Sequence, residues 1–253
     1  MATLPAKSQL TGNVSEGQFK SGMNQLIDYI SENVGNTGST GKQVITTPST
    51  WTVPDGVTTV YISQCGGGGG GSTIFGCGGG GGASVYRQPV TVSPTETITC
   101  TIGVGGAGGS SYATSNTNYL SSFSNCSGTD GGTTTFGSYV STKGGRGSTV
   151  SSSGYVVGVA GGNGGTSGAC MQLSLYDSGS NETFNGGNGG SSMFGAGGSG
   201  GYANMSTAAI TAGGDGAGYG AGGGGGALFV RGSGIGIWTR AGNGTNGVII
   251  IEW

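Results

Sequence analysis

The sequence predicts a mainly β and irregular protein with a short N-terminal helix, a small β-sandwich, and a glycine-rich region packed as polyglycine II rods with connecting loops. Three observations lead to this fold class. Glycine makes up 64 of the 253 residues. Runs of β-branched residues lie between residues 43 and 104 and again at the end of the chain. Glycine clusters, many with the pattern GGxGG, recur through the remainder and indicate a three-residue period.

The composition excludes several classes of protein. Glycine is far above its usual share of roughly 7%, yet the chain has only five prolines. Collagen is therefore excluded, because it needs glycine at every third position and abundant proline. A disordered linker is disfavoured as well, since 33% of the residues are hydrophobic and only 7% are charged. We expect a folded chain whose core differs from that of an ordinary globular domain.

Residues 1–42 predict a helical segment for attachment or oligomerisation. Ser15 followed by Gln18 matches a capping box at a helix N-terminus. The apolar residues that follow are spaced by three and four, which places them on one helical face. They are Phe19, Met23, Leu26, Ile27, Ile30 and Val34. Gly35 is placed to end the helix, and residues 35–41 have the composition of a linker.

The apolar face of this helix needs a partner, because an isolated helix of about 20 residues is marginal in water. One alternative is packing onto the chain's own body. The other is self-association or docking onto another protein, which the linker favours. The spacing approaches the a/d pattern of a coiled coil, so we expect a homotrimer or docking to a trimeric partner. The residues expected to make the oligomerisation contacts are Phe19, Met23, Leu26, Ile27 and Ile30.

Residues 43–104 together with 241–253 predict a β-sandwich. Strands are marked by β-branched or alternating residues, which occur at 44–47, 51–53, 57–65, 83–92 and 97–102. Pro54-Asp55-Gly56 predicts a turn, and Pro89 predicts an edge strand or a bulge. The last seven residues, 247–253, predict one more short strand that contains a continuous apolar run. We expect it to return to the sheet and to be buried on both faces.

Residues 105–240 predict the glycine rods. Glycine disfavours both helix and strand through its backbone entropy. It suits polyglycine II geometry, with three residues per turn and a rise of about 3.1 Å. Without Cβ atoms, neighbouring rods can approach closely and satisfy their N–H and C=O groups between rods. The alternative is that the glycine clusters are flexible loops hanging from the sandwich.

Four connectors between the glycine clusters are rich in Tyr, Ser, Asn, Thr and apolar residues, namely 110–130, 169–184, 202–211 and 227–240. Aromatic anchors among hydrogen-bonding residues are typical of binding loops, and connectors between rods emerge at rod ends. The candidate binding residues are Tyr112, Tyr119, Phe123, Tyr176, Tyr202 and Trp238. The alternative is that these aromatic residues cover the rods as a small core. We expect both, with the tyrosines and Trp238 partly exposed.

Several kinds of chemistry are not expected. The chain has no histidine, which excludes His-dependent triads and His metal sites. Its eight Lys and Arg residues are scattered, so no nucleic-acid patch is predicted. No apolar window is long enough to span a membrane, and the N-terminus lacks the apolar region of a signal peptide. The five cysteines favour free, buried thiols because their number is odd and their spacing irregular. We expect no enzymatic activity, cofactor or metal.

Four stretches of the chain resemble phage tail fibre proteins that carry a C-terminal glycine-rich domain. The opening GNVSEGQFKSGMNQLIDYI is similar to their N-terminal segment. The stretch WTVPDGVTTVYISQCGGGGGG resembles the start of the glycine-rich domain, and VTVSPTETITCTIGVGGAGG resembles its middle. The end is matched by GGGGGALF and AGNGTNGVIIIEW. The central region resembles, in composition only, the tip adhesins of T-even-like phages.

This resemblance implies a virion protein of the phage tail. It implies a fibre or receptor-binding tip that adheres to the bacterial host through loops between glycine-rich segments. The implied partners are a bacterial surface receptor, either an outer-membrane protein or a glycan, and other tail fibre or baseplate proteins. One alternative is a structural connector in the fibre without receptor contact. Another is an ice-binding polyglycine bundle, against which the long aromatic connectors and the helix argue.

Overall fold

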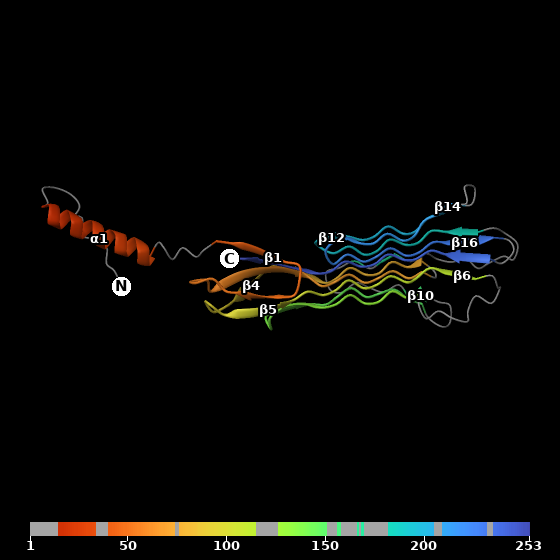
Figure 1. Cartoon of the computed structure of the whole chain (residues 1–253), viewed down its shortest axis with the longest axis horizontal. Helices are drawn as coiled ribbons and strands as arrows, with labels where there is room; N and C mark the ends of the chain where they lie inside the picture. Colours follow the sequence, from red (N-terminus) through yellow and green to blue (C-terminus); the bar gives the residue numbers. More distant parts are fainter. Residues whose placement is uncertain are drawn as a thin grey trace.

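The computed structural model shows a helix followed by an elongated body, in which a sandwich of strands continues into a bundle of parallel and antiparallel rods (Figure 1). The described residues are 15–33, 40–73, 76–114, 126–150, 156–157, 166, 168–169, 182–204, 209–231 and 235–253. Only the backbone is described at residues 28–33, 112–114, 150, 156–157, 182–184, 229–231 and 235–236.

Helix α1 (Glu16–Asn33) begins at the predicted capping box. The side chain of Gln18 accepts a hydrogen bond from the Ser15 amide at 3.0 Å, and the Gln18 amide donates to Ser15 Oγ at 3.3 Å. Two amides that the first helical turn leaves without partners are thereby satisfied. The predicted apolar stripe is exposed at Phe19, Met23 and Ile27. The helix is therefore confirmed, and these three apolar side chains are accessible to a partner.

The sandwich consists of two four-stranded antiparallel sheets. The first sheet has the order β1 (Lys42–Ile45), β18 (Val248–Glu252), β3 (Thr59–Cys65) and β4 (Ser84–Thr91). The second sheet has the order β2 (Ser49–Thr52), β5 (Thr97–Thr101), β7 (Thr134–Phe136) and β8 (Val140–Thr142).

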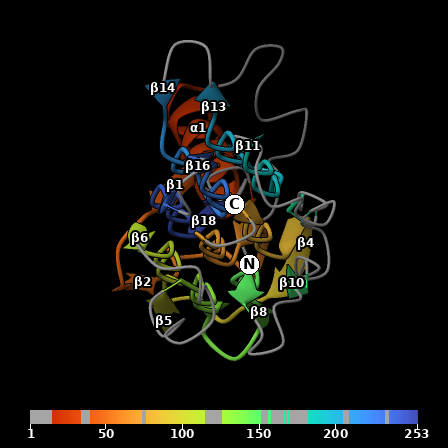
Figure 2. The same ribbon diagram turned by 90° about the vertical axis from the view of Figure 1, so that its right-hand side faces the viewer.

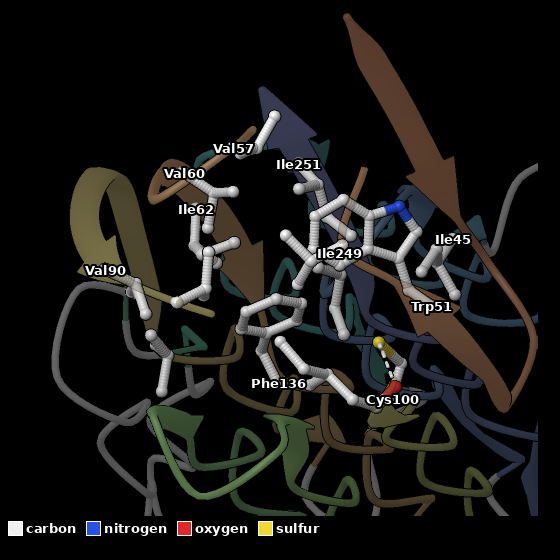
Figure 3. Packing of buried hydrophobic residues seen from close by; sticks show 14 of the residues in the cluster. Ile45, Trp51, Val57, Val60, Ile62, Val90, Cys100, Phe136, Ile249 and Ile251 are labelled. Carbon is white, nitrogen blue, oxygen red and sulfur yellow. Dashed lines mark hydrogen bonds between the residues drawn. The ribbon is translucent and has the colours of Figure 1, made fainter. Parts of the chain in front are cut away.

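A hydrophobic core fills the space between the two sheets (Figure 3). Ile249 and Ile251 of β18 and Ile62 of β3 face Phe136 of β7, and all four side chains are fully buried. The Trp51 ring lies 5.9 Å from the Phe136 ring in a tilted arrangement, which aromatic pairs favour over face-to-face stacking. Apolar burial of this kind is the main favourable term in the stability of the sandwich.

The strand topology confirms one sequence expectation and corrects two. The C-terminal strand β18 returns between β1 and β3, where Ile250 pairs with Val44 and Ser63. Its expected burial on both faces is wrong, because Ile250 is half-buried on the outer face of the first sheet. The sandwich also takes β7 and β8 from the segment 105–240, which the sequence predicted to belong to the glycine-rich region. Their short alternating runs lie between glycine clusters. β7 pairs with β5, and β8 pairs with β7 at the edge of the second sheet.

The glycine segments form rods that are held by hydrogen bonds between rods, with a strict three-residue period. In the 66–73 rod, the amides of Gly66, Gly69 and Ser72 donate to the 76–83 rod. The amides of residues 67, 70 and 73 donate to the 126–133 rod, and those of residues 68 and 71 donate to the 239–247 rod. Carbonyls of the same rod accept from three further rods, 102–110, 143–149 and 219–227. This rod is thus surrounded on all six sides.

Three rods form the centre of the bundle: 66–73, 76–83 and 219–227. They bond to one another in a closed triangle, in which Gly69 N donates to Gly80 O, Gly79 N to Gly223 O, and Gly223 N to Gly69 O, at 2.8–3.0 Å. The remaining described segments lie around them, namely 102–110, 126–133, 143–149, 166, 168–169, 185–191, 196–202, 211–217 and 239–247. The polyglycine II rods are therefore confirmed for the described residues, and flexible loops are excluded there. Two of the central rods, 66–73 and 76–83, lie in the range 43–104 that the sequence assigned to the sandwich, which corrects the predicted boundary. At the sandwich-facing end of these rods, β12 (Gly195–Ala196) and β15 (Ala217–Gly218) pair as strands.

Residues with side chains occupy the outward positions of the peripheral rods. They recur every third residue, as polyglycine II geometry requires. Examples of these exposed series are Val104, Ala107, Ser110; Lys143, Arg146, Thr149; Asn185, Asn188, Ser191; and Arg240, Asn243, Asn246. The rule links sequence to position: an uninterrupted glycine run marks a central rod, and a GGxGG pattern marks a peripheral one.

Some outward side chains also join neighbouring peripheral rods. Asn243 Oδ1 accepts from the Gly108 amide at 2.8 Å, and Asn246 Oδ1 accepts from the Gly105 amide at 2.9 Å. These carboxamides accept from backbone amides that face outward, where no neighbouring rod supplies a carbonyl group. Other side chains that accept from a neighbouring rod include Thr129, Asp130, Asn185, Asn188 and Ser191.

Close approach between rods explains why the central positions are glycine. A Cβ atom added at Gly69 would lie closer than 3.0 Å to the carbonyl of Arg146, and one at Gly223 would lie equally close to the carbonyl of Gly242. Real Cβ atoms do not approach backbone oxygens so closely. The obstructing atoms belong to the backbones of hydrogen-bonded rods, so relief requires rods to move apart and lose their bonds.

We expect Gly223→Val to destabilise the protein by more than about 3 kcal/mol, because it forces the central rods apart. Ala107→Val is the matched control, since it enlarges a side chain at an exposed position of the 102–110 rod. That change should cost less than about 0.5 kcal/mol. Chemical denaturation of both variants measures the difference. Equal unfolding midpoints for Gly223→Val and the parent would contradict tight rod packing.

Candidate functional site at the loop-bearing end

Short strands gather at the end of the body farthest from the sandwich, termed here the loop-bearing end (Figures 1 and 2). One four-stranded sheet has the order β11 (Glu182–Phe184), β16 (Leu228–Arg231), β17 (Ile235–Trp238) and β6 (Tyr112–Thr114). Two further pairs join β13 (Ala203–Asn204) with β14 (Ala209–Ile210), and β9 (Thr149–Val150) with β10 (Val156–Val157).

All four predicted connectors enter and leave at this end. β6 lies in the first connector, β11 in the second, β13 and β14 in the third, and β16 and β17 in the fourth. Three of the four connectors contribute strands to the same sheet. The fold therefore collects segments that are far apart in the sequence onto one end of a hydrogen-bonded bundle. Binding residues are commonly found in loops that a rigid scaffold positions in this way.

Tyr202 is the candidate binding residue whose exposure the structure supports. Its side chain is 47% exposed at the end of the 196–202 rod. The Tyr202 hydroxyl accepts a hydrogen bond from Asn204 Nδ2 at 2.9 Å. Its amide donates to Thr211 Oγ1 at 2.9 Å, which fixes the backbone from which the ring projects. An aromatic ring held by a short polar network is suited to contact with a partner surface.

The expected exposure of Trp238 is wrong. Its side chain is only 9% exposed, and that of its cross-strand neighbour Leu228 is 6% exposed. Both residues therefore belong to the inward face of the loop-bearing sheet. Strand alternation supplies the reason, because neighbouring residues on β17 point to opposite faces and the apolar tryptophan takes the covered one.

Ile237 takes the exposed face instead, with 42% of its side chain accessible. It pairs in register with Phe229 of β16 and Ala113 of β6. Sequence reasoning missed this residue, because it ranked aromatic residues above aliphatic ones. The alternation Ile235-Gly236-Ile237-Trp238 carries the signal, since Ile237 and Trp238 cannot both face inward in a strand.

The structure places the other predicted binding and oligomerisation residues only in part. Tyr112 lies on β6 opposite Trp238, with only its backbone described. Tyr119, Phe123 and Tyr176 lie outside the described residues. In helix α1, Leu26 is half-buried, and only the backbone of Ile30 is described.

The charge of Arg240, at the start of the 239–247 rod, is partly neutralised. Arg240 Nη1 lies 3.3 Å from Asp215 Oδ1, and both side chains are about half exposed. The same Asp215 oxygen accepts from the Asn243 amide at 2.8 Å. An exposed ion pair of this kind contributes little free energy. It links the 211–217 and 239–247 rods rather than presenting a free charge.

The cysteines follow the expectation in part. Cys65, Cys100 and Cys126 are free and buried. Burial raises the pKa of the Cys65 and Cys100 thiols to about 11, so both are protonated and unreactive at neutral pH. Cys77, however, is disulfide-bonded, which corrects the expectation that all five are free thiols. The odd number of cysteines and their irregular spacing in the sequence do not show which sulfur atoms the folded rods bring together.

The described part of the chain holds neither a metal-binding cluster nor a membrane-spanning helix. No group of three or more Cys, Asp or Glu side chains there is arranged to hold a metal ion. No helix among the same residues is long and apolar enough to cross a membrane.

Comparisons with known proteins identify the family. No curated protein matches the chain significantly. The family described as the glycine-rich domain matches residues 39–253, which include the sandwich, the rods and the loop-bearing end but not helix α1. The chain therefore belongs to the glycine-rich domain family.

Proposed function

We propose that this protein is a phage tail fibre or receptor-binding tip protein, located in the virion, that adheres to the bacterial host surface. The observation that carries the proposal is the division of the molecule into two ends. Four aromatic and polar connectors enter and leave at one end of the rod bundle. Helix α1 is joined to the other end, through the segment that leads into β1. One end is thus suited to binding and the other to attachment.

The exposed groups support binding rather than catalysis. Tyr202 and Ile237 offer aromatic and aliphatic surface, and the nearby Arg240 is paired with Asp215. Such a surface gains affinity from buried apolar area and polar contacts, with little electrostatic steering. The receptor that fits is an outer-membrane protein or a neutral glycan.

The attachment end is proposed to assemble through helix α1. The exposed fractions are 47% for Phe19, 37% for Met23 and 53% for Ile27, all on one helical face. A single helix gains little from such a stripe until a partner covers it. The proposed partners are α1 helices of two further copies, forming a homotrimer, or another tail fibre or baseplate protein.

Deletion of residues 1–34 should leave a folded body that no longer assembles. Among the residues that the structure describes, the hydrogen bonds of the rods and the hydrophobic core of the sandwich include no residue of α1. Analytical ultracentrifugation and incorporation into fibres measure the effect. An unchanged oligomer mass together with unchanged incorporation would contradict a role for the helix.

Host binding should depend on the loop-bearing end and only weakly on salt. The purified protein is expected to block adsorption of the phage to host cells. Tyr202→Ala or Tyr119→Ala should weaken blocking by about tenfold or more, the effect of removing one aromatic anchor of about 2 kcal/mol. Tyr219→Ala is the matched control, since Tyr219 is 38% exposed but follows β15 at the sandwich-facing end of the rods.

Two outcomes would contradict this site. Blocking that is unchanged in both connector variants would place the site elsewhere. Blocking that collapses between roughly 50 and 300 mM salt would show an electrostatic contact, because exposed charges are screened over about 8 Å at physiological salt. A parent protein that fails to block adsorption at all would favour the alternative, a structural connector within the fibre.

A further inference from the structure

The outer face of the first sheet carries an exposed aromatic patch that neither the sandwich core nor the loop-bearing end uses. The patch comprises Val44, Tyr61, Tyr86, Arg87 and Glu252. Val44 is 50%, Tyr61 39% and Tyr86 66% exposed. Strand pairing makes the patch continuous, because Glu252 of β18 lies directly opposite Tyr61 of β3. Aromatic and arginine side chains grouped on an exposed sheet are typical of protein interfaces.

A bulge in edge strand β4 shapes this patch. The register between β3 and β4 shifts between Ile62 and Gln64, and Arg87 in the bulge has a φ of 47°. Glycine adopts that left-handed conformation without strain, whereas arginine does not. The Arg87 amide donates to Ser63 Oγ at 2.9 Å, which stabilises the bulge. An arginine at a position that favours glycine indicates that its side chain is needed.

The Arg87 side chain organises the centre of the patch. Its guanidinium carbon lies 5.1 Å from the centroid of the Tyr61 ring. One of its nitrogen atoms lies 3.3 Å from Glu252 Oε2, and both side chains remain partly exposed at 48% and 30%. The guanidinium is thereby held in place over an aromatic ring, with donors left for a second partner.

We propose that this patch is the contact between the body of one copy of the chain and the body of a second copy. The proposal relies on the assembly of α1 proposed above. Helix α1 ends at Asn33, and β1, which belongs to the sheet that carries the patch, begins at Lys42. The eight residues between them span at most about 29 Å. Helices that associate therefore hold the bodies close together, at a high effective concentration. The patch is self-complementary in charge, since Arg87 of one copy can approach Glu252 of another.

Photocross-linking of the full-length protein tests this contact. Tyr86 is replaced by p-benzoylphenylalanine, which retains an aromatic ring at the exposed position. Tyr139, 40% exposed and next to β8 of the second sheet, is replaced in the same way as the control. Irradiation should join two chains from position 86, with mass spectrometry mapping the attachment to the outer face of the first sheet. Position 139 should give no such product.

Arg87→Gly separates assembly from folding. It removes the strained conformation, so the melting temperature should stay level or rise, while the cross-link yield from position 86 should fall about tenfold. A lower melting temperature with an unchanged yield would overturn the proposal, because Arg87 would then serve the fold alone. Absence of any chain-to-chain product from position 86 would overturn it as well. The oligomer mass and the adsorption blocking of the parent are measured separately, so failure of this contact is distinguishable from failure of α1 assembly and of receptor binding.

Discussion

The fold depends on hydrogen bonds between rods, because a polyglycine II rod makes none within itself. Each central rod needs neighbours on every side, as the six rods around residues 66–73 show. Those neighbours must approach so closely that a Cβ atom at Gly69 or Gly223 meets a carbonyl oxygen. The backbone N–H and C=O groups can therefore find partners only where the central rods carry no side chains. It explains how a chain with so few large apolar residues outside its sandwich forms an ordered body.

The sandwich sets the positions from which the rods start. The strands β3, β5 and β8 lead directly into rods, and the strands β4, β7 and β18 are entered directly from rods. At the junction, Gln64 Nε2 donates to the Thr134 carbonyl and to Thr142 Oγ1, both at 3.3 Å, and so connects the two sheets where the hydrophobic core ends. Strand pairing thereby fixes the spacing of six rods, whose far ends then hold the connectors together.

Sequence reasoning identified the helix, the sandwich and the rods because each has its own period in the chain. The capping box at Ser15 and the return of the C-terminal strand followed from local patterns. The position of each rod in the bundle did not follow from local patterns. A glycine pattern shows how many sides of a rod are covered by neighbours, but it does not show which rods those neighbours are. Trp238 was misplaced for a related reason. Its burial depends on pairing with Leu228, and composition alone does not show which face of a strand is covered.

Amide hydrogen exchange measured residue by residue tests the rod packing most directly. We expect slow exchange for the amides of Gly69, Gly70 and Gly223, which bond to central or surrounding rods. In peripheral rods we expect protection with a three-residue period, interrupted at outward residues such as Asn188 and Arg240. Exchange of the central glycine amides at the rate of an unstructured chain, with no period along the peripheral rods, would contradict the rod packing.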